Sequence, residues 1–407
     1  MRVLTYGCAT NQADSEIIRG VLREHGLDRE EVVVVNTCTV KSPTENKILK
    51  KMRKLGADGE KVVVAGCMPP ARPGIVDEFP TFSFIGVNTH DIVEAVSATA
   101  KGERYVNIRG SENKSCMPRV RANEAVGILP IGEGCLGSCS YCQTKFARGN
   151  LRSYPLDKLA GEVERMVGEG VREVWMTSQD TGAYGRDIGS GLPELLKSIC
   201  GVDGDFKVRV GMMNPDHALK MLEDLVGAFD DDKMYRFLHI PVQSGSDKVL
   251  EDMNRRYTVE DFHSIVDRVG DFTLSTDVIV GYPTEGESEF QETVSLIEDV
   301  KPDVLNVSRY WPRPGTRAAR LKGHPGSETK RRSRIMDEVF QRVGLEKNKK
   351  WIGWRGPALV SEANPDGTVT ARNQHYKPIV AKGGRLGESI DVEVRDCTYY
   401  DLRGSLL

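Results

Sequence analysis

Three cysteines, Cys135, Cys139 and Cys142, form a CxxxCxxC pattern in the segment GCLGSCSYCQTKFARG, shortly after the apolar run GILPI. Three thiolates hold only three irons of a 4Fe-4S cube, which leaves the fourth iron open to a substrate or a cofactor. A structural zinc site is the alternative, but such a site normally has four Cys or His ligands. No fourth ligand stands within ten residues of the triplet, so the spacing favours an iron-sulfur cluster built for chemistry.

A second set of three cysteines follows three apolar runs near the N-terminus. Cys8 follows VLTY, Cys38 follows VVVV and Cys67 follows VVVA. Parallel strands bring their C-terminal ends to one edge of a sheet, where open α/β folds bind ligands, so we expect these cysteines to converge. Chance is the alternative, because cysteine is common at buried positions. The same placement three times favours a second three-thiolate cluster, with Asn11 as a candidate to line it; a turn or helix-cap role is the alternative for Asn11.

Length and composition bound the class of protein. The chain has 407 residues, too many for one ordinary core, and its 39% hydrophobic and 28% charged content is typical of soluble globular proteins. Its apolar runs are too short to cross a bilayer, and the N-terminus enters a strand-like run without the features of a signal peptide. Nine cysteines in such a chain indicate metal ligation in a reducing compartment. We therefore expect a cytoplasmic protein with no membrane partner.

The charge is distributed unevenly along the chain. The formal net charge of -3 argues weakly against a nucleic-acid partner. Residues 305–355, however, hold fourteen Lys and Arg against four Asp and Glu, a local balance of +10. Such a segment can neutralise several backbone phosphates, although a solvated helix face explains part of it equally well.

The pattern of apolar runs predicts an α/β protein with three parts. Residues 1–110 alternate strand-like runs with amphipathic segments such as SEIIRGVLREHG, which predicts a small parallel α/β domain. Residues 120–345 hold six strand-like runs that alternate with helical ones: GILPIG, REVWMTSQD, FKVRVGMMNP, YRFLHIPVQS, FTLSTDVIVGYP and VLNVSRYWPR. Six units predict a partial (β/α)6 barrel with a lateral opening for a large substrate. Residues 346–407 carry short β-rich runs and the turn signals NPDG and GGRLG, which predict a five-stranded antiparallel barrel.

A CxxxCxxC loop after the first strand of a partial barrel resembles the radical S-adenosylmethionine superfamily. The resemblance implies that the amino and carboxylate groups of S-adenosylmethionine occupy the open iron of a 4Fe-4S cluster. It further implies that electron transfer cleaves the sulfonium to yield a 5'-deoxyadenosyl radical. Tyr141, the aromatic residue within the motif, would by this resemblance lie against the adenine; packing within the loop is its alternative.

Other strand ends of the barrel supply candidate contacts to this cofactor. A molecule with ribose hydroxyls, an ammonium and a carboxylate needs donors and acceptors in a partly apolar cleft. The candidates are Ser178, Gln179 and Asp180 after the second strand, Asn214 after the third, Gln243 and Ser244 after the fourth, and Gly281 after the fifth. Each has a turn or cap role as its alternative. Arg209 points either inward toward a carboxylate or outward to solvent, and period-two alternation does not decide between them.

An N-terminal three-cysteine domain, a radical barrel and a small C-terminal β-barrel, in that order, resemble the methylthiotransferases over nearly the whole chain. Within that family, TKFARGNLRSYP, DTGAYGRDIG, HIPVQSGSD and RYWPRPGT are similar to the eukaryotic and archaeal branch that acts on N6-threonylcarbamoyladenosine in tRNA. The C-terminal segment resembles a TRAM domain, which is an RNA-binding barrel in these proteins.

The resemblance also implies a reaction, in which adenosine 37 of the tRNA anticodon stem-loop receives a methylthio group at C2. A radical route is reasonable because an aromatic C–H bond is a poor target for acid-base chemistry near neutral pH. Two 4Fe-4S clusters are implied: the one on Cys8, Cys38 and Cys67 presents sulfur, one S-adenosylmethionine gives the methyl group and another gives the radical. A ferredoxin- or flavodoxin-like reductant and a sulfur donor are implied partners.

For the tRNA we place phosphate contacts in the basic segment that leads into the C-terminal barrel, on Lys347, Lys349, Lys350 and Arg372. Trp351, Trp354 and Tyr376 are candidates to stack on bases, with the core of the barrel as their alternative. Two other functions compete with this hypothesis. One is the same chemistry on isopentenyladenosine in tRNA or on an aspartate of a ribosomal protein. The other is a non-catalytic RNA-binding protein whose metal sites are structural.

Overall fold

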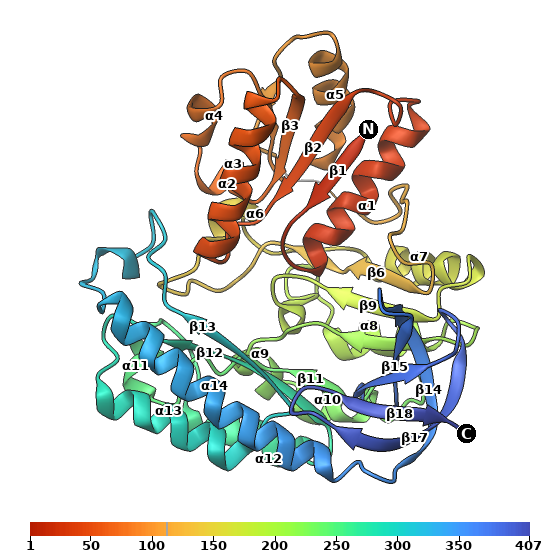
Figure 1. Cartoon of the computed structure of the whole chain (residues 1–407), viewed down its shortest axis with the longest axis vertical. Helices are drawn as coiled ribbons and strands as arrows, with labels where there is room; N and C mark the ends of the chain where they lie inside the picture. Colours follow the sequence, from red (N-terminus) through yellow and green to blue (C-terminus); the bar gives the residue numbers. More distant parts are fainter. Residues whose placement is uncertain (111–112) are drawn as a thin grey trace.

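The computed structural model describes residues 1–110 and 113–407, and it begins with a parallel α/β region (Figure 1). Five strands form one parallel sheet in the order β1-β2-β3-β4-β5: β1 (Arg2–Thr5), β2 (Val32–Thr37), β3 (Lys61–Gly66), β4 (Ser83–Ile85) and β5 (Val106–Asn107). The sequence predicted the first three strands. It missed β4 and β5 because runs of three and two residues are too short to show a periodic pattern.

Helices cover both faces of this sheet, which explains why its central strands are apolar without alternation. Val32 and Val34 pack with α1 (Ala9–Glu24) and α5 (Ile92–Ala100). Val33 and Val35 pack on the other face, with α2 (Ser42–Ala57) and the short helices α3 (Met68–Ala71) and α4 (Ile75–Glu78). A 3-10 turn, η1 (Thr89–Asp91), precedes α5.

The middle region is the predicted partial barrel of six parallel strands. It consists of two three-stranded sheets, β10-β9-β6 and β11-β12-β13, which meet at a bridge between Val208 and Met234. The strands are β6 (Val126–Pro130), β9 (Glu173–Thr177), β10 (Lys207–Val210), β11 (Phe237–His239), β12 (Thr273–Val280) and β13 (Val304–Arg309). A small antiparallel pair, β7 (Gly132–Glu133) and β8 (Arg152–Ser153), encloses the CxxxCxxC loop.

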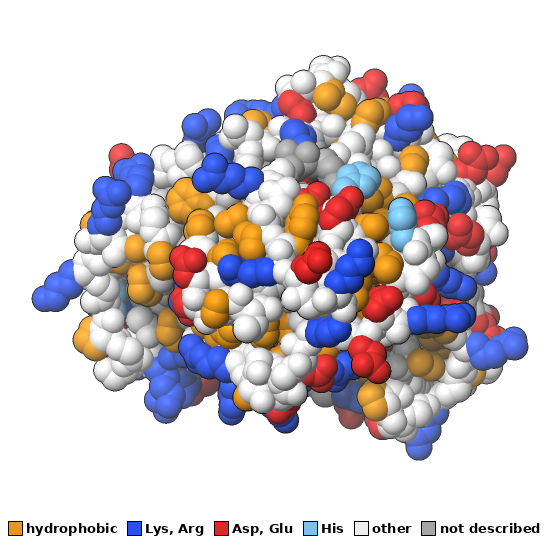
Figure 2. Space-filling view, turned by 90° about the horizontal axis from the view of Figure 1, so that it is seen from above, with side chains coloured by type: hydrophobic (Ala, Val, Ile, Leu, Met, Phe, Trp, Pro, Cys, Tyr) orange, Lys and Arg blue, Asp and Glu red, His pale blue; other side chains and the backbone are white. Residues whose placement is uncertain are grey.

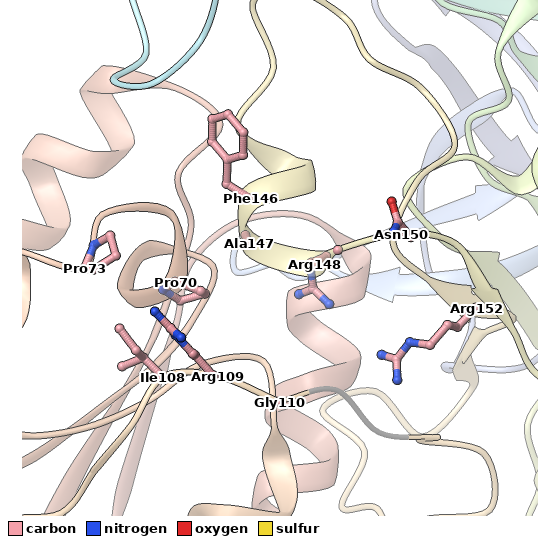
Figure 3. A pocket seen from close by; sticks show the side chains of 11 residues that line it. Pro70, Pro73, Ile108, Arg109, Gly110, Phe146, Ala147, Arg148, Asn150 and Arg152 are labelled. Carbon is pink, nitrogen blue, oxygen red and sulfur yellow. The ribbon is translucent and has the colours of Figure 1, made fainter.

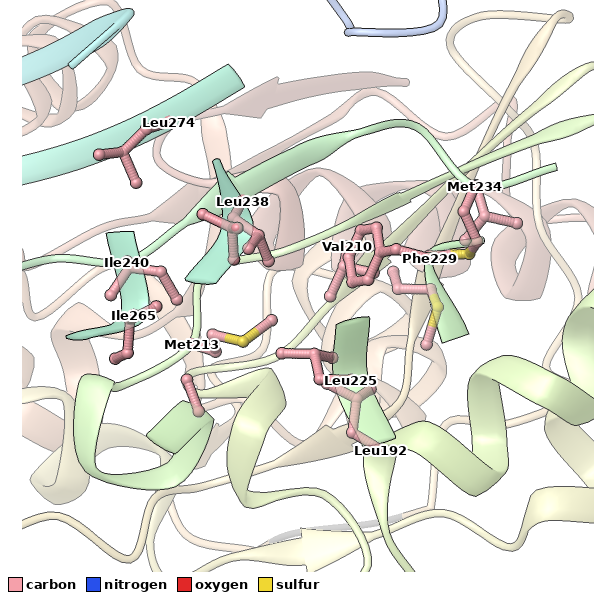
Figure 4. Close-up of a cluster of buried hydrophobic side chains, with 14 of the residues drawn as sticks. Leu192, Val210, Met213, Leu225, Phe229, Met234, Leu238, Ile240, Ile265 and Leu274 are labelled. Atoms are coloured by element: carbon pink, nitrogen blue, oxygen red, sulfur yellow. The ribbon is translucent and has the colours of Figure 1, made fainter. Parts of the chain in front are cut away.

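Helices cover the outer face of these strands, and their apolar sides form the largest core of the protein. Figure 4 shows part of this core, where Val210 and Leu238 of the strands meet Leu192, Leu225 and Ile265 of the helices. The helices of this part of the chain are α6 (Thr144–Arg148), α7 (Leu156–Gly168), α8 (Leu192–Cys200), α9 (Pro215–Leu219), α10 (Leu222–Ala228), α11 (Asp247–Asp252), α12 (Val259–Val269), α13 (Glu287–Val300) and α14 (Gly326–Lys349), with 3-10 turns η2 (Thr181–Ala183) and η3 (Ala318–Arg320). Of these, α6 lies apart from the outer face and packs against α3 of the first region. Across the described residues, no helix combines the length and the apolarity that a bilayer span requires.

The C-terminal region is a closed five-stranded barrel in the order β14-β15-β16-β18-β17. Its strands are β14 (Arg355–Ala363), β15 (Thr368–Arg372), β16 (Pro378–Lys382), β17 (Ser389–Cys397) and β18 (Leu402–Leu406). Four of the pairings are antiparallel, but β16 and β18 are parallel, which corrects the purely antiparallel prediction. The reason is parity: strand directions cannot alternate around a closed ring with an odd number of strands.

The C-terminal barrel is docked against the N-terminal ends of the middle strands. Tyr376 packs against Tyr235 and Phe237 in tilted ring pairs, with 4.8 Å and 5.0 Å between ring centroids. The buried Asp303, which directly precedes β13, accepts hydrogen bonds from Lys347 of α14 at 2.9 Å and from Lys377 of the docked barrel at 3.0 Å. Aromatic packing and a buried ion cluster therefore hold this barrel in place.

Candidate active site

The three N-terminal cysteines lie at one edge of the first sheet, directly after β1, β2 and β3. The side-chain oxygen of Asn11 lies 3.6 Å from Sγ of Cys67 and 4.0 Å from Sγ of Cys8. Cys38 lies against the same turn, since a Cβ added to Gly7 would lie 3.1 Å from its Sγ and 3.1 Å from Nδ2 of Asn11. Cys8 stands at the N-cap position of α1. The geometry thus brings together the three cysteines and the residue that the sequence placed beside them.

The second trio lies in the loop between β7 and α6, and each of its thiols accepts a hydrogen bond. The backbone N–H of Gly137 donates to Cys135 Sγ at 3.2 Å, and that of Thr144 donates to Cys142 Sγ at 3.4 Å. The Arg255 guanidinium donates to Cys139 Sγ at 3.2 Å. Donors of this kind stabilise negative sulfur, as the ligands of a cluster require.

Burial disfavours the free thiolate at both sites. It raises the pKa of Cys67 to about 11 and the pKa of Cys135 to about 12. A bound cation would reverse this, because it replaces the thiol proton. Within the described ranges no three His, Cys, Asp or Glu side chains stand close enough to chelate one metal ion.

Arg148, at the end of α6, joins the two sites through a buried network. Its Nε donates to Cys67 Sγ at 3.3 Å, and its Nη2 donates to Asn11 Oδ1 at 2.9 Å. The same guanidinium pairs with Asp14 at 2.7 Å and with Glu133 at 2.6 Å. Lys114 completes the network with a 2.7 Å contact to Asp14. The side chains of the four charged residues are 1–2% exposed, so the N-terminal region, the connecting segment and the barrel share one buried ionic core.

Gln143, at the other end of α6, makes a second connection. Its Oε1 accepts a hydrogen bond from the Thr39 hydroxyl at 2.9 Å, one residue after Cys38. Its Nε2 donates to the backbone oxygen of Pro314 at 2.8 Å, in the loop after β13. The single helical turn that follows Cys142 is therefore bonded at both ends to loops of the first trio.

Comparison with known proteins agrees with this architecture. A family model described as "Radical SAM superfamily" matches residues 129–297, and one described as "Uncharacterized protein family UPF0004" matches residues 1–85. A protein of Pyrococcus horikoshii named "Probable threonylcarbamoyladenosine tRNA methylthiotransferase" is 42% identical, over 99% of this chain and 98% of its own. The human protein named "Threonylcarbamoyladenosine tRNA methylthiotransferase" is 37% identical, over 99% of this chain and 73% of its own.

This chain belongs to the threonylcarbamoyladenosine tRNA methylthiotransferase family. It is thus a radical S-adenosylmethionine protein, a class that uses S-adenosylmethionine and a 4Fe-4S cluster. Among solved structures, the radical S-adenosylmethionine methyltransferase TsrM from Kitasatospora setae has a TM-score of 0.54 at 17% identity, over 73% of this chain and 68% of its own. That likeness bears on the fold alone.

In this methylthiotransferase the candidate cofactor contacts divide into two groups, and the first gathers beside the second trio. Gln179 Oε1 accepts a hydrogen bond from Gly134 N at 2.6 Å, next to Cys135. Asp180 accepts from Asn214 N at 3.0 Å and contacts His217 Nδ1 at 2.8 Å. The side-chain oxygen of Asn214 is buried with no partner among the described residues, which leaves it available to a ligand. Ser178 Oγ accepts from the backbone of Asp180, and Tyr141 packs at the edge of a buried cluster that includes Tyr282 and Tyr310.

The other candidates have structural explanations. The Ser244 hydroxyl is fully buried, where it meets Thr293 of α13 and accepts from Ser246 N. Gln243 pairs through its backbone with β12 at a φ of 71°. Gly281 has a φ of 73°, and a Cβ there would lie 2.5 Å from Thr329 of α14, so its lack of a side chain permits close helix packing.

Arg209 lies on the inner side of its strand. Its neighbours Val208 and Val210 face the helical core, so Arg209 faces inward, as one of the two predicted alternatives had it. Its role as a contact to the cofactor stays a prediction.

The residues predicted to contact RNA fall into two groups, those exposed to solvent and those engaged within the protein. Lys349 and Lys350 are exposed at the end of α14. Lys347 is engaged with Asp303, and Arg372 pairs with Glu362 at 3.0 Å with its side chain only 17% exposed. Trp351 and Trp354 pack against the core of the C-terminal barrel, and Tyr376 is buried in the docking interface. These positions favour barrel packing over base stacking for all three aromatics, and disfavour a phosphate contact for Arg372.

A pocket of about 460 Å³ lies beside α6, on the side of the Cys67–Arg148 contact (Figure 3). Its apolar walls come from Pro70, Pro73, Ile108 and Phe146. Its cationic groups come from Arg109, Arg148 and Arg152. Phe146 is 49% exposed. The surface next to the first trio thus combines apolar and cationic groups.

Sequence reasoning missed Arg148, Arg255 and Gln143 as parts of the site. Gln143 and Arg148 lie in the segment CQTKFARG, which begins at Cys142. Both therefore belong to the cysteine motif from which the sequence analysis starts. Arg255 stands in MNRRYT, more than a hundred residues from Cys139. Spacing along the chain carried no signal that Arg255 returns to the cysteine loop.

Proposed function

We propose that this protein methylthiolates C2 of N6-threonylcarbamoyladenosine at position 37 of tRNA. The observation that carries the proposal is the connection of the two three-cysteine sites through α6, which follows Cys142 and is bonded at both ends to loops of the first trio. The chain also matches its named relatives over nearly its whole length. Sulfur insertion needs one site that handles S-adenosylmethionine and another that handles sulfur, and two open cubes supply both.

The chain's own residues divide the work. Cys135, Cys139 and Cys142 would hold one 4Fe-4S cluster, and Cys8, Cys38 and Cys67 a second. When bound, these clusters and S-adenosylmethionine supply the electron, the radical, the methyl group and the sulfur. Arg255 and Arg148 donate hydrogen bonds to one thiolate of each set and offset their negative charge.

Tyr141 beside the second trio, with the oxygen of Asn214 and the Asp180–His217 pair, would form the S-adenosylmethionine site. These groups supply an apolar surface for the adenine and acceptors for ammonium and hydroxyl groups. Gln179 would hold the cysteine loop in place through Gly134.

The tRNA would approach over the surface shared by the three regions. Lys349 and Lys350 supply phosphate contacts at the junction with the C-terminal barrel, which would act as a TRAM-like RNA-binding domain. On the face seen in Figure 2, basic side chains are interspersed with acidic ones, so that face offers no comparable attraction for phosphate. A ferredoxin- or flavodoxin-like reductant and a sulfur donor would complete the cycle in the cytoplasm.

We also propose domain limits of 1–110, 120–345 and 346–407. Separate hydrophobic cores support this division: two beneath the faces of the first sheet, one around the partial barrel and one inside the closed barrel. The buried network of Arg148 and Lys114 would then be a contact between domains.

Two cysteine variants test the division of labour in reconstituted protein. Cys139→Ala should abolish formation of 5'-deoxyadenosine from S-adenosylmethionine. Cys38→Ala should spare that cleavage and lose sulfur insertion, with about half the iron of the unmodified protein. Equal loss of cleavage in both variants would refute the assignment. Retention of the 2-methylthio form of threonylcarbamoyladenosine in tRNA from cells that lack this chain would refute the proposed substrate.

A further inference from the structure

The pocket beside α6 is positively charged and has an exposed aromatic ring in its wall. Segments from two regions of the chain surround it: α3 and the residues after β5 on one side, and α6 with β8 on the other (Figure 3). Its described lining includes Arg109, Arg148 and Arg152 but no Asp or Glu. Its volume of about 460 Å³ lies within the range of about 300–1,000 Å³ for ligand pockets. The pocket therefore has room for one nucleotide and favours an anionic ligand.

Two of these arginines carry positive charge that the protein itself does not neutralise. Arg109 is exposed and pairs with no carboxylate among the described residues. Arg152 contacts Glu133 at 3.3 Å. That carboxylate, however, belongs to the buried network around Arg148, whose four members already balance to zero charge. Arg109 and Arg152 thus leave a surplus of two positive charges at the pocket, which attracts phosphate.

The ring of Phe146 is supported from below and open on the pocket side. About half of this residue, 49%, is exposed. Its ring lies against the loop after β13, where a Cβ added to Gly315 would be 3.3 Å from it. Nε2 of Gln143 holds α6 to the same loop through the backbone oxygen of Pro314, at 2.8 Å. An aromatic ring that is already held in place is suited to stacking on a base, because little conformational freedom is lost on binding.

The position of the pocket indicates which nucleotide it receives. Arg148 lines it and also donates to Cys67 Sγ at 3.3 Å, and Phe146 follows Cys142 by four positions. The pocket therefore adjoins the first trio and lies within a few residues of the second. S-adenosylmethionine is a poor occupant, because its sulfonium and ammonium groups give it a net positive charge that the arginines repel. An RNA loop whose adenosine 37 lies at the trios brings a neighbouring base and its phosphates to this place.

We propose that this pocket binds a nucleotide that flanks adenosine 37 in the anticodon loop, with its base stacked on Phe146 and its phosphates against Arg109 and Arg152. This inference rests on the proposed function and adds a subsite for the RNA beyond the modified base. Stacking tolerates any base, so the pocket would hold loops of different sequence in one register.

The test measures binding of stem-loop RNAs to protein with both clusters reconstituted, without S-adenosylmethionine so that no reaction occurs. Each RNA carries threonylcarbamoyladenosine at position 37, and its loop is either complete or has an abasic nucleotide at position 36 or 38. Unmodified protein should bind one of the two abasic RNAs roughly 5- to 100-fold more weakly than the complete RNA, the range for loss of one stacked base. Phe146→Ala should bind that abasic RNA and the complete RNA equally. Phe146→Tyr should restore the difference.

The salt dependence of binding tests the phosphate contacts independently. Arg109→Gln should reduce the slope of log Kd against log salt by about 0.7, the value for one phosphate contact to a single strand. Arg53→Gln changes an exposed arginine of α2 that also has no carboxylate partner among the described residues, and it should leave the slope unchanged. Tyr400→Ala removes an aromatic residue that is 66% exposed, and it should keep the dependence on the flanking base.

The outcomes separate this subsite from the proposed function. Equal binding of all three RNAs by unmodified protein, or a difference that persists in Phe146→Ala, would overturn the subsite. Displacement of the complete RNA by an equal concentration of free adenosine monophosphate would overturn it in favour of a site for free nucleotides. These results leave the proposed function intact if unmodified protein still forms the methylthio product. Absence of that product from an RNA that shows the expected dependence on the flanking base would refute the proposed function alone.

Discussion

Removal of Arg148 should destabilise the protein strongly even before any cluster is bound. Its guanidinium is 1% exposed and pairs with Asp14 and Glu133, whose side chains are 2% exposed. With Lys114 these four buried groups balance to zero charge, and Arg152, whose side chain is 37% exposed, pairs with Glu133 from the surface at 3.3 Å. Arg148→Met therefore leaves one buried negative charge that only this half-exposed arginine offsets. Breaking a buried ion pair on one side costs about 3–5 kcal/mol. Each kcal/mol lowers the melting temperature by about 2–4 °C for regions of this size, so the melting temperature should fall by about 6–20 °C.

The assay is thermal melting of the metal-free protein under reducing conditions, followed by circular dichroism. Arg148→Met combined with Asp14→Asn removes the excess charge and should recover part of the loss. The control is Arg342→Met, which breaks a surface pair whose partners are 61% and 43% exposed and should cost less than about 1 kcal/mol. If the melting temperature of the Arg148→Met variant lies within about 2 °C of that of the unmodified protein, the buried ion network around Arg148 does not stabilise the fold, which would contradict this prediction.

Three further changes probe other parts of the structure. Lys377 and Lys347 hold the pKa of Asp303 below its ordinary value, against burial, which raises it. The contribution of Asp303 to the free energy of unfolding is therefore complete above about pH 4, and it is lost as the pH falls further through the folded-state pKa. Hydrogen exchange in β14–β18 of the metal-free protein should become faster over that acidic range. Asp303→Asn should show that loosening already at pH 7. Gly281→Ala should destabilise by roughly 1–3 kcal/mol through the close approach to Thr329, while Gly161→Ala, in open space on α7, should be neutral or stabilising on denaturant melting. Arg255→Gln should make the reduction potential of the cluster at Cys139 more negative, as read by redox titration of its EPR signal, whereas an unchanged potential would mean that Arg255 does not tune the cluster.

Much of the architecture was predictable because it depends on local pattern. Six apolar runs at regular spacing predicted the six strands of the partial barrel. Turn signals between β-rich runs predicted the five-stranded barrel at the C-terminal end of the sequence. Cysteines placed directly after three buried strands predicted the convergence of Cys8, Cys38 and Cys67, because parallel strands share one edge. The sequence missed β4 and β5, which are too short for periodicity. It also predicted a purely antiparallel barrel, whereas closure of a ring with an odd number of strands requires the parallel β16–β18 pairing.

By itself the sequence determined where the six candidate thiols stand and which strands carry them, since thiol spacing and strand ends are local properties of the chain. Only the tertiary structure decided what surrounds those atoms. Arg255 reaches Cys139 across 116 positions and Arg148 reaches Cys67 across 81, and no periodic pattern records such contacts. The face of Arg209 was equally undetermined, because alternation along one strand is symmetric until helices cover one side of it. Helices cover the face that carries Val208 and Val210, so the side chain of Arg209 faces the interior of the partial barrel.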